Sequence, residues 1–161
     1  MPTTIKKLTA EDVETLIGIA RDSWKWAYRD IYSNDFIESW IREKYSKDKL
    51  LNEIIRSQTD LDIIFLGSFS ESTMTGFVEL KTSANKAELL RFYLKPEYTH
   101  GGIGKLLLLE AEKIMKKKGI VECSLCVHQQ NGVAVSFYKK NGFVVKGIEG
   151  DDFVMEKKYN P

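Results

Sequence analysis

The residues of this chain best suited to chemistry form a turn from Pro96 to Lys105, with glycines at Gly101, Gly102 and Gly104. A β-rich run, 87–95, leads into the turn, and an amphipathic helical pattern, 105–118, follows it. Glycine lets backbone N–H groups approach an anion closely, and a helix N-terminus adds unpaired donors and a favourable dipole. The turn is therefore predicted to bind a phosphate or pyrophosphate, as part of a nucleotide-like cofactor.

The elements around this turn predict a mixed sheet. Before it, strands are expected at 4–8, 62–69, 75–82 and 87–95, and the short turns between the last three favour antiparallel hairpins. After it, a strand is expected at 121–127, and its long helical connection predicts parallel pairing with 87–95. A helix at 131–140 and a hairpin of 143–148 with 152–158 complete the pattern.

Helices are expected in the N-terminal third. A capping box at Thr9–Asp12 begins a helix that runs towards Trp24, Ser33 or Asn34 caps a second helix through Trp40, and Ser46 begins a third. The whole chain, 1–161, is thus predicted to be one α+β domain: a mixed, mostly antiparallel sheet with helices on both faces.

Composition excludes several classes of protein. The chain has 161 residues, 43% of them hydrophobic, and a net charge of +1, so no large basic field marks a nucleic-acid binder. No apolar run approaches the roughly 20 residues that span a bilayer, and the N-terminus lacks the apolar core of a signal peptide. A cytoplasmic protein without a membrane or nucleic-acid partner is expected.

The two cysteines, Cys123 and Cys126, form a C-x-x-C inside the strand expected at 121–127. Positions i and i+3 of a strand point to opposite faces, so the pair is badly placed for a disulfide or a shared metal. No second Cys/His pair completes a zinc set, and no metal site is predicted.

Two segments resemble the GNAT superfamily of acyl-CoA-dependent N-acetyltransferases. The segment Thr99–Gly104 is similar to its Q/R-x-x-G-x-G/A signature, with Thr99 as a departure where Gln or Arg is usual. The segment Asn131–Phe143 resembles the N-x-x-A-x-x-F-Y-x-x-x-G-F segment of the family, and a helix and a strand separate the two as in the family. The resemblance is strong from about Glu79 to Phe143 and weak before Asp62.

The resemblance implies acetyl-CoA or coenzyme A as the cofactor, bound by a core at about 62–143. The strand at 87–95 would diverge from its parallel neighbour, and the backbone of Phe92, Tyr93 and Leu94 would pair with the pantetheine arm, which Asn131 would bind from the other side. The pyrophosphate would be held by the turn residues Thr99, His100, Gly101, Gly102, Ile103, Gly104 and Lys105.

The implied reaction is direct transfer of an acetyl group to a primary amine. Tyr138 holds the position of the acid that protonates the departing thiolate, and a backbone N–H near Leu94 would bind the oxyanion. Glu88 is the expected base and Glu79 its alternative, because burial would raise a Glu pKa towards the useful range. Water and His128 are open alternatives for the base. His100 is an open candidate for a contact with a phosphate.

The acceptor is expected against helices at about 9–57. Trp24, Trp26, Tyr28 and Tyr32 offer cation–π contacts to an amine, with Glu79 on the sheet beside them. Asp30, Asp35 and Glu38 are candidates for negative charge. The layout is most similar to family members that include polyamine (spermidine/spermine) N-acetyltransferases. A homodimer is compatible with the sequence.

Two other functions remain open, and a third is disfavoured. The same scaffold could serve as a non-catalytic CoA sensor, or acetylate the N-termini of peptides or proteins. A Rossmann or P-loop nucleotide domain is disfavoured because Leu107 stands where a third glycine belongs and no G-x-x-x-x-G-K-[ST] is present.

Overall fold

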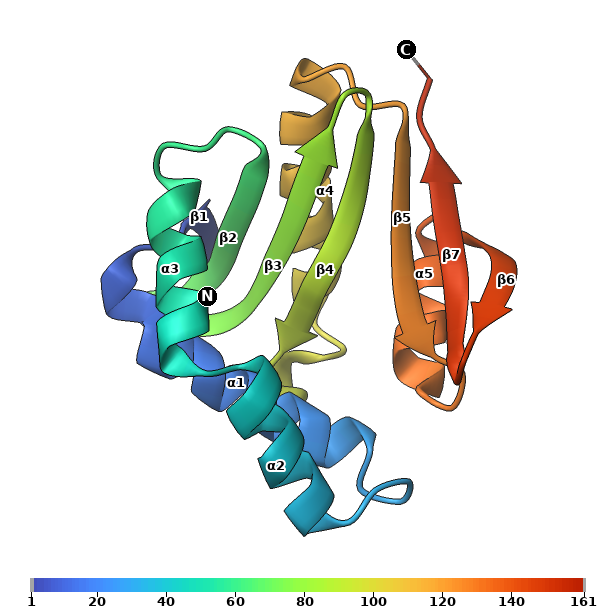
Figure 1. Ribbon diagram of the computed structural model, residues 1–161. Coiled ribbons are helices and arrows are strands. Elements are labelled where there is room, and N and C mark those ends of the chain that lie inside the picture. Colours follow the sequence, from blue (N-terminus) through green and yellow to red (C-terminus); the bar gives the residue numbers. More distant parts are fainter. Residues whose placement is uncertain (1, 161) are drawn as a thin grey trace.

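A seven-stranded sheet in the order β1-β2-β3-β4-β5-β7-β6 forms the centre of the protein, of which the computed structural model describes residues 2–160 (Figure 1). All neighbouring strands pair antiparallel except β4 and β5, which are parallel. The mixed, mostly antiparallel α+β fold predicted from the sequence is confirmed. The strands are β1 (Thr3–Lys7), β2 (Ile63–Ser70), β3 (Thr73–Ser83), β4 (Lys86–Leu94), β5 (Glu122–His128), β6 (Val144–Glu149) and β7 (Asp152–Lys158).

Helices cover both faces of this sheet (Figure 1). One face packs against α1 (Val13–Ala27), α2 (Asn34–Lys44) and α3 (Lys47–Ser57), in a core that includes Phe65 and Phe77. The other face packs against α4 (Ile103–Lys117) and α5 (Gly132–Lys140). The helices of the first face come before β2 in sequence, and those of the second face come after β4.

The predicted helix starts are confirmed by their caps. The Ser33 hydroxyl accepts the N–H of Phe36 at 3.1 Å, and the Ser46 hydroxyl accepts the N–H of Lys49 at 3.3 Å. The box at Thr9 is formed too, although its first turn is the 3-10 helix η1 (Ala10–Asp12), which leads into α1. Two helices end later than predicted, α1 at Ala27 and α2 at Lys44, because their apolar faces continue to pack.

β4 and β5 pair over only three positions, Lys86 with Glu122, Ala87 with Cys123 and Glu88 with Ser124. Beyond Glu88 the two strands diverge, as Figure 1 shows. The β3–β4 register shifts between Glu79 and Leu80, which leaves Leu90 as an extra residue in β4. The bulge and the divergence begin together, so one edge of β4 is free of a strand partner from Leu89 to Leu94.

Cys123 is buried and Cys126 is exposed on β5, and both are free thiols. Their opposite orientations agree with the strand geometry expected from the sequence. Within residues 2–160, no helix is both long enough and apolar enough to cross a lipid bilayer.

Candidate active site

A cavity of about 370 Å³, here called the donor cavity, lies between the diverging end of β4 and the helices α1, α4 and α5. It extends from the glycine turn to Tyr138. Among the residues that line it are ten of the predicted cofactor contacts: Phe92, Tyr93, Leu94, Thr99, His100, Gly102, Gly104, Lys105, Asn131 and Tyr138. Ser23, Trp26, Ala27, Lys140 and Asn141 also line it and were missed by sequence reasoning or, for Trp26, assigned to the acceptor.

The glycine turn has the geometry of an anion site. Gly102 has φ of +81°, a left-handed conformation that favours glycine, and it begins α4 without a side-chain cap. The first amide of α4 with a backbone acceptor is that of Leu106, which donates to Gly102 O. Among residues 2–160, the N–H groups of 103–105 have no partner, so the N-terminus of α4 presents unpaired donors at the donor cavity.

Not every residue of the turn faces this cavity. Gly101 is exposed and Ile103 is buried in the core, and neither lines the donor cavity. The Thr99 hydroxyl donates to Pro96 O at 2.9 Å, so it stabilises its own turn. A Cβ at Gly104 would lie 3.1 Å from the Phe137 ring, which shows how closely α4 and α5 approach here.

The backbone of β4 alternates between its two edges. Lys95 N–H donates to Thr75 O at 2.9 Å, so Lys95 and Tyr93 direct their backbone groups to β3. The N–H and C=O of Phe92 and Leu94 therefore point to the opposite edge, into the gap left by β5. The expectation that the backbone of Tyr93 pairs with a pantetheine arm is corrected: its amide groups belong to the β3 ladder, and its side chain lines the cavity.

A second cavity of about 430 Å³, here called the acceptor cavity, lies on the other side of the same gap. The two cavities share the lining residues Phe92, Tyr93, Asn131, Ala134 and Tyr138. A group in one cavity can therefore meet a group in the other at Tyr138. This arrangement suits a reaction between two molecules that enter from different sides.

Aromatic side chains form one wall of the acceptor cavity. Trp24, Tyr28 and Tyr32 line it as expected, together with Phe36 and Trp40. The Trp24 and Tyr28 ring centroids lie 4.3 Å apart, and Trp24 Nε1 donates to the Tyr93 hydroxyl at 3.1 Å. These contacts fix the rings, whose faces can stabilise a cation.

Asn131 connects the aromatic wall to α5. Its side-chain oxygen accepts the N–H of Ala134 at 3.2 Å and caps the helix, and its amide nitrogen donates to the Tyr28 hydroxyl at 3.4 Å. Asn131 thereby holds α1 and α5 together where the two cavities meet.

Tyr138 is 7% exposed and lines both cavities. Burial, and then the neighbouring Tyr93, Cys123 and Tyr28, raise the pKa of the Tyr138 phenol far above its ordinary value. No residue between 2 and 160 forms a hydrogen bond with its hydroxyl in this structure. Tyr138 is therefore a protonated donor available at the junction of the cavities.

The opening of the acceptor cavity is acidic. Asp151 and Asp152, at the β6–β7 turn, line it, because β5 pairs with β7 and places Asp152 opposite His128. Burial raises the pKa of Asp152, and Asp151 and Glu149 add to the rise while His128 opposes it. Sequence reasoning recognised this turn only as a hairpin, since the strand pairing that brings it to the site is not local.

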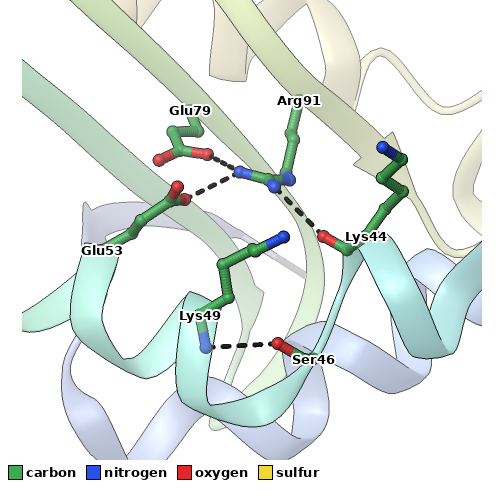
Figure 2. Close-up of polar contacts among 6 residues, drawn as sticks. All are labelled: Lys44, Ser46, Lys49, Glu53, Glu79 and Arg91. Carbon is green, nitrogen blue, oxygen red and sulfur yellow. Dashed lines mark hydrogen bonds and ion pairs between the residues drawn. The ribbon is translucent and has the colours of Figure 1, made fainter.

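Both carboxylates proposed for the base lie elsewhere. Glu88 is exposed and lines neither cavity, so the burial that the base role requires is absent. Glu79 is completely buried, but it forms an ion pair with Arg91 beneath α3 (Figure 2) and does not reach the acceptor cavity. The predictions that Glu88 is the base and that Glu79 contacts the acceptor are corrected on these grounds. Asp30, Asp35 and Glu38 do not line the acceptor cavity either.

His128 lines the acceptor cavity, edge-on to Tyr28 and Tyr32. Its Nδ1 accepts the N–H of Gln130 at 3.1 Å, so the neutral ring carries its proton on Nε2. A ring in this tautomer donates a hydrogen bond from Nε2. Both alternatives that the sequence gave for the first acceptor of the amine proton, water and His128, therefore stay proposals.

Comparison with known proteins agrees with this geometry. The profile of the acetyltransferase (GNAT) family matches residues 25–143. A spermidine N(1)-acetyltransferase from Thermoplasma acidophilum is 70% identical over 159 residues, 99% of each chain. The crystal structure of a PaiA N-acetyltransferase from the same organism, in complex with coenzyme A, has a TM-score of 0.96 and 70% identity over 99% of this chain and 100% of that one.

A more distant enzyme has the same fold. The ribosomal-protein-S18-alanine N-acetyltransferase from Escherichia coli has a TM-score of 0.73 at 17% identity, over 98% of this chain and 94% of the other. The family match covers the glycine turn, the diverging strands and α5, which together build the donor cavity. This chain belongs to the GNAT family of acetyltransferases.

Proposed function

We propose that the protein transfers the acetyl group of acetyl-CoA directly to a primary amine of a polyamine such as spermidine. The observation that carries the proposal is the meeting of the donor and acceptor cavities at Tyr138. The spermidine N(1)-acetyltransferase that is 70% identical supports the polyamine as acceptor, and the coenzyme A complex of a 70% identical protein supports the donor.

Coenzyme A fits the donor cavity on the chemistry of its lining. The unpaired amides at 103–105, with the exposed Lys105, would hold the pyrophosphate. The edge groups of Phe92 and Leu94 would pair with the amides of the pantetheine arm. We infer that 62–143 holds the cofactor, with α1 of the 9–57 segment contributing Ser23 and Trp26, and that 9–57 otherwise forms the acceptor side.

Three needs of the reaction have candidates in this chain. When bound, acetyl-CoA supplies the acetyl group as a thioester. The acceptor amine, with an ordinary pKa of about 10.4, must first lose a proton, for which the acceptor cavity opens to water. As the C–N bond forms, a backbone N–H near Leu94 that the pantetheine arm leaves unpaired would stabilise the oxyanion. As the C–S bond breaks, Tyr138 donates its proton to the departing thiolate.

An amine panel tests this proposal. Purified protein with acetyl-CoA should release free thiol with spermidine, and calorimetry should show binding of coenzyme A. Coenzyme A binding without thiol release from any amine would replace the proposal by a non-catalytic sensor. Release with a peptide bearing a free N-terminus, and none with polyamines, would replace it by a peptide acetyltransferase.

We also infer a cytoplasmic location, which stays a prediction from the sequence, and a homodimer, with which the sequence is compatible. Light scattering coupled to size exclusion measures the oligomeric state, and a monomer at all concentrations would contradict the second inference.

A further inference from the structure

The acidic opening of the acceptor cavity has no role in the chemistry described above. Asp152 is half-buried at the start of β7, and Asp151 is exposed beside it at the tip of the hairpin. Among residues 2–160, these two are the only carboxylates that line either cavity. They therefore form a pair ordered by depth, with Asp152 inside and Asp151 outside.

A continuous path of side chains connects these carboxylates to Tyr138. Asn131, which lines both cavities with Tyr138, donates to the Tyr28 hydroxyl. The Tyr28 ring lies 5.5 Å from that of His128, which in turn pairs across the strands with Asp152. Because the Tyr138 side chain is more than nine-tenths buried, lines the same cavity and has a hydroxyl without a hydrogen-bond partner among residues 2–160, the cavity has a reactive end and an acidic end.

The acidic end lacks a matching cation. No Lys or Arg within residues 2–160 lines the acceptor cavity, and neither Asp151 nor Asp152 forms an ion pair with Lys or Arg there. Other partly buried carboxylates do have such partners: Glu53 pairs with Arg91 and Glu112 with Lys157, at 2.7 and 2.8 Å. A half-buried carboxylate without a cation is costly, and a cationic ligand would lower that cost.

We propose that Asp152 and Asp151 bind the ammonium groups of the polyamine that are not being acetylated, with Asp152 on the inner group and Asp151 on the outer one. The inference rests on the proposed function. Spermidine carries three amino groups, and the two that do not react stay protonated near neutral pH. When its aminopropyl end reacts at Tyr138, the secondary ammonium lies three carbons further out and the terminal ammonium lies beyond it.

Three amines that share the aminopropyl end separate the two sites: propylamine, 1,3-diaminopropane and spermidine. Asp152→Asn should raise the KM of the diamine and of spermidine by about tenfold each, the loss of one charge-assisted hydrogen bond. Asp151→Asn should raise the KM of spermidine alone. Neither change should alter the KM of propylamine, which has no second cation, or the Kd of coenzyme A.

Glu149→Gln is the matched control, since it removes one negative charge from the same hairpin at a residue that does not line the cavity. Its effect on the KM of spermidine should stay below about twofold. If Glu149→Gln and Asp152→Asn raise the KM of spermidine equally, the hairpin acts through its overall negative charge and the two-site proposal is wrong. If the Asp variants also raise the KM of propylamine, the two Asp residues have a structural role, which likewise overturns the proposal. If the protein without any substitution acetylates no polyamine, that result contradicts the proposed function instead.

Discussion

Glu79 on β3 and Arg91 on β4 form an ion pair beneath α3, and Glu79 Oε2 has no hydrogen-bond partner among residues 2–160. Arg91 also binds Glu53 of α3 at 2.7 Å and donates to Lys44 O at 3.3 Å, as Figure 2 shows. One cation thus joins two carboxylates and the end of α2. The arrangement connects the acceptor-side helices to the two central strands of the sheet.

Glu79→Gln is expected to flatten the pH dependence of stability. Burial raises the pKa of Glu79 to about 8, with Glu53 adding to the rise and Arg91 opposing it. A carboxyl group with a raised pKa in the folded chain stabilises the fold below its ordinary pKa of 4.5, and this contribution is lost as the pH rises through about 8. Urea unfolding at about pH 5 and about pH 9 should therefore give more similar free energies for Glu79→Gln than for the unchanged protein.

Glu110→Gln serves as the control for this titration, because the Glu110 side chain on α4 is 43% exposed and pairs with Lys113 at the surface. It should leave the pH dependence as it is. If the free energy of unfolding changes with pH to the same extent in the Glu79 variant and in the unchanged protein, Glu79 is ionised throughout this range.

Arg91→Met should destabilise the protein by about 3–5 kcal/mol near neutral pH, because it leaves the partly buried Glu53 without a cation and the buried Glu79 carboxyl without its hydrogen-bond donor. The Arg91 side chain is 15% exposed and also lies over the Tyr45 ring, 5.0 Å from its centroid. The free energy of unfolding in urea measures the loss. A double change with Glu53→Gln should recover part of it, and no recovery would mean that lost packing dominates.

Tyr138→Phe should lower kcat by about 100-fold or more, since it removes the proposed acid, with little change in the Kd of coenzyme A. Steady-state thiol release and calorimetry give the two quantities. Tyr159→Phe is the matched control, because Tyr159 donates to Glu112 on α4, outside both cavities. Comparable rates for Tyr138→Phe and Tyr159→Phe would remove Tyr138 from the mechanism.

Gly102→Ala should weaken binding of coenzyme A by about tenfold, because Ala in the left-handed conformation costs about 1 kcal/mol and the turn would relax away from its anion geometry. Gly18→Ala is the comparison: a Cβ there meets nothing within 4 Å in the middle of α1. It should stabilise the protein by about 0.5–1 kcal/mol. Calorimetry that finds the same coenzyme A affinity in both variants would contradict the role of the turn.

Glu88→Gln should keep kcat within about twofold of the unchanged protein, since the residue lies in solvent outside both cavities. The pH profile of kcat/KM is the measurement that matters. The loss of its acidic limb in the variant would restore Glu88 as the base.

Local signals predicted most of the fold. The hydroxyl caps at Ser33 and Ser46 join residues less than four positions apart, and the turn before α4 depends on one glycine. Such local features can be predicted from the sequence alone. The parallel pairing of β4 with β5 followed from the length of the helical connection. The bulge at Leu90 left no such signal, because its cause is the pairing of β4 with β3.

The site was predictable where it depends on backbone conformation and less so where it depends on side-chain neighbours. Gly102 and Tyr138 line the cavities as the resemblance implied, and Trp24, Tyr28 and Tyr32 line the acceptor cavity as expected, whereas Trp26 lines the donor cavity. Glu79 and Glu88 looked alike in the sequence, yet one is buried against Arg91 and the other is exposed. Burial is a property of what packs around a residue, so residue type could not separate them.

The sequence by itself determined the order of elements, the glycine turn before α4 and the position of Tyr138 on α5, since each depends on a few adjacent residues and on backbone geometry. Only the tertiary structure decided which carboxylates face the acceptor. Asp151 and Asp152 reach it through the β5–β7 pairing, and Glu79 is held away by Arg91. Electrostatic interactions act through space, and the distances that govern them exist only after distant segments have packed together.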